Sequence, residues 1–88
     1  MGRYRYKILS MDIEDFLEKI KAEFVEDYDL GSLGADDNIK NMDWWSSMHA
    51  LVIIALIDAE YDIMLEPSEM RNASTVRELF LIVKNKKG

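Results

Sequence analysis

The chain has no cysteine and only one histidine among its 88 residues. The lack of cysteine excludes disulfide frameworks, thiolate zinc sites and cysteine nucleophiles, so stability must come from packing. His49 has no cysteine or second histidine as a companion, which makes it a poor candidate for a metal ligand or a general base. We therefore expect no metal site.

Long apolar runs are also missing. The longest, residues 50–57, covers about two helical turns, whereas crossing a bilayer takes about 20 apolar residues. We expect no membrane insertion. Residues 1–10 contain arginines but lack the apolar core and cleavage pattern of a signal peptide, so we interpret them as an N-terminal extension or leader. We expect a cytoplasmic monomer.

Basic residues are scarce in the body of the chain. Residues 11–75 hold sixteen acidic and four basic side chains, a balance of −12, and the other seven basic residues lie near the two ends. Such a body repels phosphate backbones, which argues against nucleic-acid binding. It favours a basic partner protein, although an acidic surface also serves solubility alone.

Apolar residues make up 49% of the chain and recur at helical spacing in several blocks. Residues 12–26 form the first block and predict a helix that Ser10 or Asp12 caps. Its predicted buried stripe consists of Ile13, Phe16, Leu17, Ile20, Phe24 and Val25. Residues 27–43 are rich in glycine, acids and asparagine and predict a long loop. Four apolar residues should anchor this loop: Leu30, Leu33, Ile39 and Met42.

Residues 47–61 contain no helix breaker and predict a second helix, with Ser46 as its cap. Its side chains are apolar on more than one side. One stripe can face the core, namely Met48, Leu51, Ile54, Ala55, Ile57 and Tyr61. Val52, Ile53 and Leu56 then remain as surplus apolar surface on other sides of the helix.

Pro67 predicts a turn into a short third helix that ends near Arg71 or Asn72. Ser74 or Thr75 forms a capping box with Glu78 at the start of the last helix. The buried stripe of that helix should be Val76, Leu79, Phe80, Ile82 and Val83. We predict one all-α domain over residues 11–85, followed by a tail of residues 86–88. It is an up-and-down four-helix bundle with a short third helix and a long loop between helices one and two.

This order of helices, with Trp45-Ser46-Ser47-Met48 opening the second one, resembles the acyl carrier protein family. The resemblance covers nearly all of residues 12–85 and is that of a divergent member. The family marks its attachment site by an Asp-Ser-Leu motif at the start of the second helix, and Ser47 matches the modified serine. The Tyr61-Asp62 ending of the second helix is similar to the family pattern as well.

The resemblance implies a carrier that holds an acyl group as a thioester on a phosphopantetheine arm attached to Ser47. Such a protein is a substrate of enzymes and not a catalyst. Its implied partners are a phosphopantetheinyl transferase and acyl-transferring or synthase enzymes of fatty-acid, lipid or specialised secondary-metabolite biosynthesis. An exposed serine at a helix start suits this role, because free amides and the helix dipole favour a phosphodiester there. Ser46, Met48 and His49 should surround the arm.

The sequence departs from the family at three positions near this serine. Ser46 stands where the family usually has aspartate, His49 where an acid is common, and Val52 where an acid lies on the helix surface. The start of the helix therefore loses charge and gains apolar surface, which predicts more apolar and more specialised partner recognition. The predicted partner-binding residues are Asp43, Trp44, Trp45, Val52, Leu56 and Met64.

Two other functions fit parts of the pattern. An unmodified acidic helical module would bind a basic protein through the second helix and the tryptophans. An acidic nucleic-acid mimic is less consistent with the sequence, because apolar residues interrupt the acids. The acids of residues 27–37 do not match a calcium loop, since the glycine of the sharp turn and the closing glutamate are missing.

Overall fold

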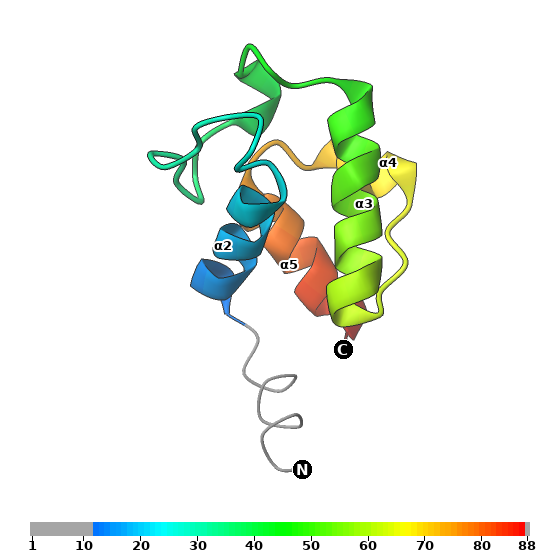
Figure 1. The fold of residues 1–88 in the computed structure, drawn as a ribbon. Helices are drawn as coiled ribbons and strands as arrows, with labels where there is room; N and C mark the ends of the chain where they lie inside the picture. The colour runs from blue at the N-terminus through cyan, green and yellow to red at the C-terminus, as the bar shows by residue number, and fades with distance from the viewer. Residues whose placement is uncertain (1–11, 88) are drawn as a thin grey trace.

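The computed structural model describes residues 12–87, which form four α-helices and one short 3₁₀ turn and contain no strand (Figure 1). The elements are α2 (Ile13–Glu23), η1 (Ile39–Asn41), α3 (Ser47–Tyr61), α4 (Pro67–Asn72) and α5 (Val76–Lys87). The all-α class and the long connection between the first two long helices are confirmed, and α3 has the predicted bounds. The expected N-terminal extension, residues 1–10, lies outside the described residues.

The long helices do not alternate strictly in direction. In Figure 1, α2 runs upward, whereas α3 and α5 both run downward. Asp62 ends α3 in the left-handed conformation, with φ of 57°, and the non-helical residues 62–66 then carry the chain back up beside α3 to α4. The molecule is therefore a small helical bundle that departs from the expected up-and-down order.

The starts of α2 and α5 use the caps expected from the sequence. Asp12 accepts a hydrogen bond from the Asp15 amide at 2.8 Å at the start of α2. At the start of α5, Thr75 Oγ1 accepts from the Glu78 amide at 3.0 Å, and the Glu78 carboxylate accepts from the Ser74 amide at 2.6 Å. These bonds satisfy amides that have no partner inside a helix.

Two helix ends differ from the prediction. The first helix ends at Glu23 and not at residue 26, because the Phe24 amide donates to the Lys21 carbonyl at 3.2 Å and tightens the chain into a turn. At the other end, α5 continues to Lys87, so residues 86 and 87 belong to the helix and not to a tail. Lys86 Nζ lies 2.9 Å from Glu69 Oε1 and ties this last turn to α4.

The core takes side chains from all four helices and from the long loop. Phe16 is central, with its ring centroid 5.4 Å from that of Phe80 and 5.8 Å from that of Tyr61. The largest fully buried side chains are Phe16, Ile20, Ile53, Ile57, Leu65, Leu79, Val76 and Val83. Leu30, Leu33 and Ile39 are also buried, which confirms that they anchor the loop.

The predicted core face of α3 is wrong in part. Ile53 is fully buried, although the sequence placed it on the surplus side, whereas Met48 is 71% exposed and Leu51 is 61% exposed. Because α3 is apolar on every side, its periodicity does not define a face, and contacts with the other helices select it. Ala55 is exposed as well, and Val25, beyond the end of α2, is 68% exposed.

The long loop is bonded to the start of α5. The Ile39 amide donates to the Ser74 carbonyl at 3.0 Å, and the Arg77 amide donates to the Ala35 carbonyl at 2.9 Å. Arg77 also pairs with Asp36, with Nε and Oδ1 2.6 Å apart, and this hydrogen bond holds the pKa of Asp36 below its usual value. The loop is therefore placed by specific bonds as well as by its buried side chains.

Replacing Tyr61 by phenylalanine should stabilise the protein. Tyr61 Oη is buried and has no hydrogen-bond partner among the described residues, and burial raises the pKa of this phenol to about 12. Removing an unsatisfied buried hydroxyl while keeping the ring should raise the free energy of unfolding by about 1 kcal/mol. Urea denaturation followed by circular dichroism measures this; a loss of stability in Tyr61→Phe would show that the hydroxyl has a partner.

Candidate functional site

Ser47 is the first residue of α3, and its side chain is exposed. Two features define this position. The Trp45 amide donates to the Met42 carbonyl at 3.1 Å, which turns the end of the loop, and Ser46 is extended as the residue before the helix. The hydroxyl of Ser47 therefore lies at the amino-terminal end of a 15-residue helix, where the helix dipole is positive.

Ser46 does not cap α3 with its side chain, contrary to the prediction. It occupies the cap position, but its Oγ lies 2.8 Å from Nδ1 of His49, and no side-chain cap bond is formed. The nearby histidine offers the hydroxyl a ring nitrogen in place of a backbone amide. The first turn of α3 is thus left without a side-chain acceptor from its cap residue.

His49 lies within an aromatic cluster and is half-buried. Its ring centroid is 5.3 Å from that of Phe24 and 5.4 Å from those of Tyr28 and Trp44. The cluster consists of Phe24, Tyr28, Trp44, Trp45 and His49. It packs the end of α2 and the end of the loop against the start of α3 and so holds the backbone around Ser47.

A groove between α3 and α4 has Ser47 in its wall and a volume of about 270 Å³. We call it the Ser47 groove. It is lined by Lys40, Trp45, Ser47, Ala50, Leu51, Ile54, Pro67, Met70 and Arg71. The walls are mainly apolar, and the two basic side chains come from η1 and α4. The sequence interpretation missed Lys40 and Arg71 because they are 31 positions apart and join only when the loop folds over α4.

The predicted partner-binding residues are only partly gathered on one surface. Asp43 and Met64 are exposed, and Trp44 and Trp45 are half-buried in the aromatic cluster. Val52 and Leu56 are half-buried and pack against the core, so they offer less surface than expected. The most exposed large apolar side chains of α3 are Met48 and Leu51.

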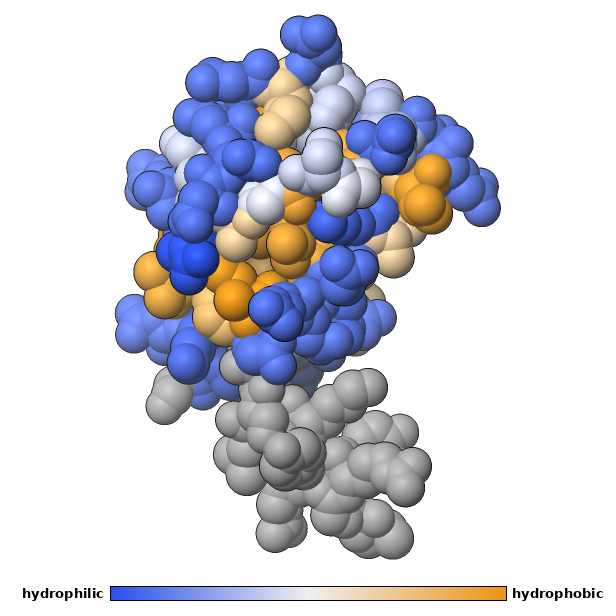
Figure 2. Space-filling view, turned by 90° about the vertical axis from the view of Figure 1, so that its left-hand side faces the viewer, coloured by the Kyte–Doolittle hydropathy of each residue, from blue (hydrophilic) through white to orange (hydrophobic). Residues whose placement is uncertain are grey.

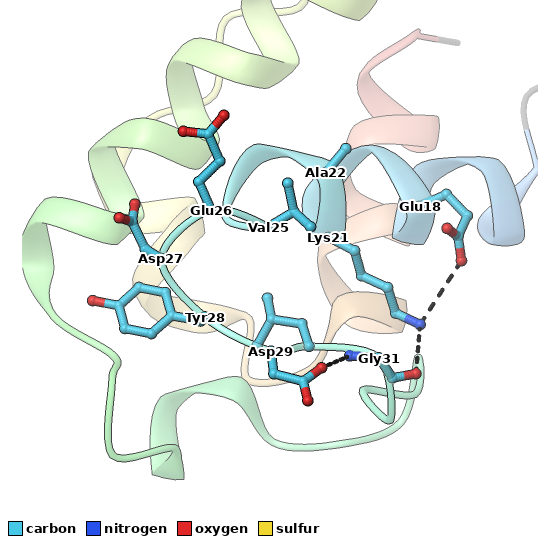
Figure 3. Close-up of a pocket in the computed structure, with 10 residues that line it drawn as sticks. Glu18, Lys21, Ala22, Val25, Glu26, Asp27, Tyr28, Asp29 and Gly31 are labelled. Carbon is cyan, nitrogen blue, oxygen red and sulfur yellow. Dashed lines mark hydrogen bonds and ion pairs between the residues drawn. The ribbon is translucent and has the colours of Figure 1, made fainter.

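A larger hollow lies away from Ser47, at the carboxyl end of α2. It has a volume of about 820 Å³ and acidic walls that include Glu18, Asp27 and Asp29 (Figure 3). Lys21 reaches across it, with Nζ 3.8 Å from Glu18 and 3.3 Å from the Gly31 carbonyl oxygen. The side of the molecule formed by α2 and the loop is mainly hydrophilic, with hydrophobic residues in its middle (Figure 2). None of the predicted site residues lines the hollow at the end of α2.

Comparisons of the chain with models of known families, with curated proteins and with solved structures found no match. Within residues 12–87, no helix has both the length and the hydropathy needed to span a bilayer. The same residues hold no group of three or more histidine, aspartate or glutamate side chains that could bind a metal ion.

Proposed function

We propose that this protein is an acyl carrier that bears a phosphopantetheine arm on Ser47. The observation that carries the proposal is that Ser47, exposed at the start of a long helix, lines a groove that is also lined by two basic residues. A phosphodiester at this position would meet the positive end of the helix dipole and the charges of Lys40 and Arg71. The residues present therefore fit the phosphate of the arm.

Few groups of the chain itself take part in this chemistry. In the attachment step the Ser47 oxygen forms a bond to the β-phosphorus of coenzyme A, the pyrophosphate bond breaks, and adenosine 3′,5′-bisphosphate leaves. The serine proton passes to a base of the transferase, so no base is needed beside Ser47. The arm then supplies a thiol that carries the acyl group as a thioester. The protein presents this group to partner enzymes and is not itself the catalyst.

The aromatic cluster and the exposed apolar side chains have separate roles in this proposal. The cluster keeps the first turn of α3 in one conformation, so that the transferase meets a preformed site. Met48 and Leu51 provide apolar surface beside Ser47 for partner enzymes. This agrees with the absence of acids at residues 46 and 49, where the carrier family places charge for its partners.

Mass spectrometry after incubation with a broad-specificity phosphopantetheinyl transferase and coenzyme A tests the proposal. We expect the wild type to gain the mass of one phosphopantetheine group, and Ser47→Ala to gain none. Ser46→Ala is the matched control, because it removes the neighbouring hydroxyl and should still be modified. No gain in the wild type, or a gain that persists in Ser47→Ala, would refute the proposal.

An unmodified interaction module is the second candidate. The exposed apolar residues Met48 and Leu51 on an acidic protein favour it, because such a surface suits a partner with both apolar and basic groups. The response to Ser47→Ala distinguishes the module from the carrier, because a basic partner of the module would bind this variant as tightly as the wild type. The partner would lose binding to Leu51→Asp.

A further inference from the structure

The basic side chains of the described residues fall into two groups. Four of the eight make ion pairs with carboxylates, namely Lys19 with Asp15, Lys21 with Glu18, Arg77 with Asp36 and Lys86 with Glu69. The other four, Lys40, Arg71, Lys84 and Lys87, have no such pair within residues 12–87, and only Lys40 and Arg71 among them line the same groove. Two uncompensated positive charges are therefore brought together on a protein of net negative charge.

Both of these side chains line the Ser47 groove, and the fold fixes one of them firmly. Asn38 caps the η1 turn by accepting from the Lys40 amide at 3.0 Å, and Ile39 buries its side chain beside it. The Lys40 ammonium donates to the Arg71 carbonyl oxygen at 2.6 Å. An ammonium has three N–H groups, so this bond leaves two for a further acceptor.

The remaining walls of the groove select for a chain-like anion. Ala50, Leu51, Ile54, Pro67 and Met70 supply apolar surface next to the two cations. The groove has a volume of about 270 Å³. One water molecule takes up about 30 Å³ in the liquid, so the groove has room for roughly nine molecules or chemical groups of that size. A phosphate with a short apolar segment fits this space, whereas a complete phosphopantetheine arm with an acyl chain is too large for it.

We propose that Lys40 and Arg71 bind the phosphate of the phosphopantetheine arm and that the Ser47 groove holds the first part of that arm. The inference rests on the proposed function, because attachment at Ser47 brings the phosphate to this groove. It assigns two residues a role that the motif around Ser47 does not contain. The thiol and its acyl group then extend beyond the groove toward partner enzymes.

The unmodified protein allows this inference to be tested apart from the attachment reaction. The ¹⁵N-labelled wild type is titrated to millimolar concentrations with free 4′-phosphopantetheine and, at matched ionic strength, with pantetheine, which lacks the phosphate. We expect saturable shifts at the amides of Lys40, Ser47 and Arg71 with phosphopantetheine only. Binding should weaken at least about tenfold in Lys40→Gln/Arg71→Gln, because two charge-assisted hydrogen bonds are lost.

Lys84→Gln/Lys87→Gln is the matched control, since it removes the same charge from α5, outside the groove, and should bind phosphopantetheine as the wild type does. Far-ultraviolet circular dichroism checks that each variant is folded, and the comparison of the two probes in the wild type needs no variant. Equal shifts with pantetheine, no shifts with phosphopantetheine, or equal weakening in both double variants would overturn the inference. A wild type that binds phosphopantetheine in the groove but gains no mass with the transferase would refute the proposed function, and only the binding of a phosphate by Lys40 and Arg71 would then stand.

Discussion

Replacing Ile53 by aspartate is expected to unfold the protein, whereas the same change at Leu51, two positions away on α3, should be tolerated. Ile53 is fully buried, and Leu51 is 61% exposed. An unpaired carboxylate in the core costs several kcal/mol, which approaches the total stability of about 5 kcal/mol expected for a small domain. A change at an exposed position typically shifts stability by about 0.5 kcal/mol or less. Circular dichroism at neutral pH compares the helical content of the two variants.

The two variants control for each other. Both put the same residue into the interior of the same helix, so the loss of helix propensity is similar and only burial differs. If both variants unfold, or if both stay folded, the face of α3 that packs on the core is not the one that contains Ile53. A folded Leu51→Asp is also the protein needed to test whether a partner uses this surface.

Phe16→Ala is expected to lower the free energy of unfolding by about 3–5 kcal/mol. The Phe16 side chain is 1% exposed, and its ring contacts those of Phe80 and Tyr61, with centroid distances of 5.4 and 5.8 Å. Truncation removes buried apolar area and two aromatic contacts, and the surrounding helices close the resulting cavity only in part. Urea denaturation measures the change, and a small domain of this kind should be largely unfolded at 37 °C after it.

Val25→Ala is the control for this prediction. It also shortens an apolar side chain near α2, but Val25 is 68% exposed, so the expected change is within about 0.5 kcal/mol. A loss below about 1 kcal/mol in Phe16→Ala would mean that α2 is not packed on α5 through this ring. The two results together would show whether α2 contributes one buried face to the bundle.

The pattern of residues in the sequence predicted much of the candidate site. The lack of a breaker from residue 47 to residue 61 located α3 at its observed bounds, and the serines before this run indicated where the helix begins. Exposure of Ser47 followed from that position, because the first residue of a helix has few neighbours on its amino-terminal side. The modification of Ser47 stays a prediction until its mass is measured.

The same pattern misassigned the side chains around Ser47. Ser46 has the residue type of a cap, yet its hydroxyl bonds to His49, which lies three positions along the chain. The sequence alone cannot decide whether the Ser46 hydroxyl bonds to a backbone amide of α3 or to the His49 ring, since both lie within its reach. The position of His49 among aromatic rings depends on Phe24 and Tyr28, which come from the end of α2 and the start of the loop.

Periodicity and capping residues were sufficient to locate the four helices. An α-helix is stabilised by hydrogen bonds between residues four positions apart, and its ends are stabilised by the residues next to them. Assembly of the bundle decided which side of α3 is buried, since that helix is apolar all round and offers no local preference. It also brought Lys40 of η1 and Arg71 of α4 together, through a hydrogen bond across 31 positions. Contacts of this kind depend on where distant segments pack, so they are absent from any short stretch of sequence.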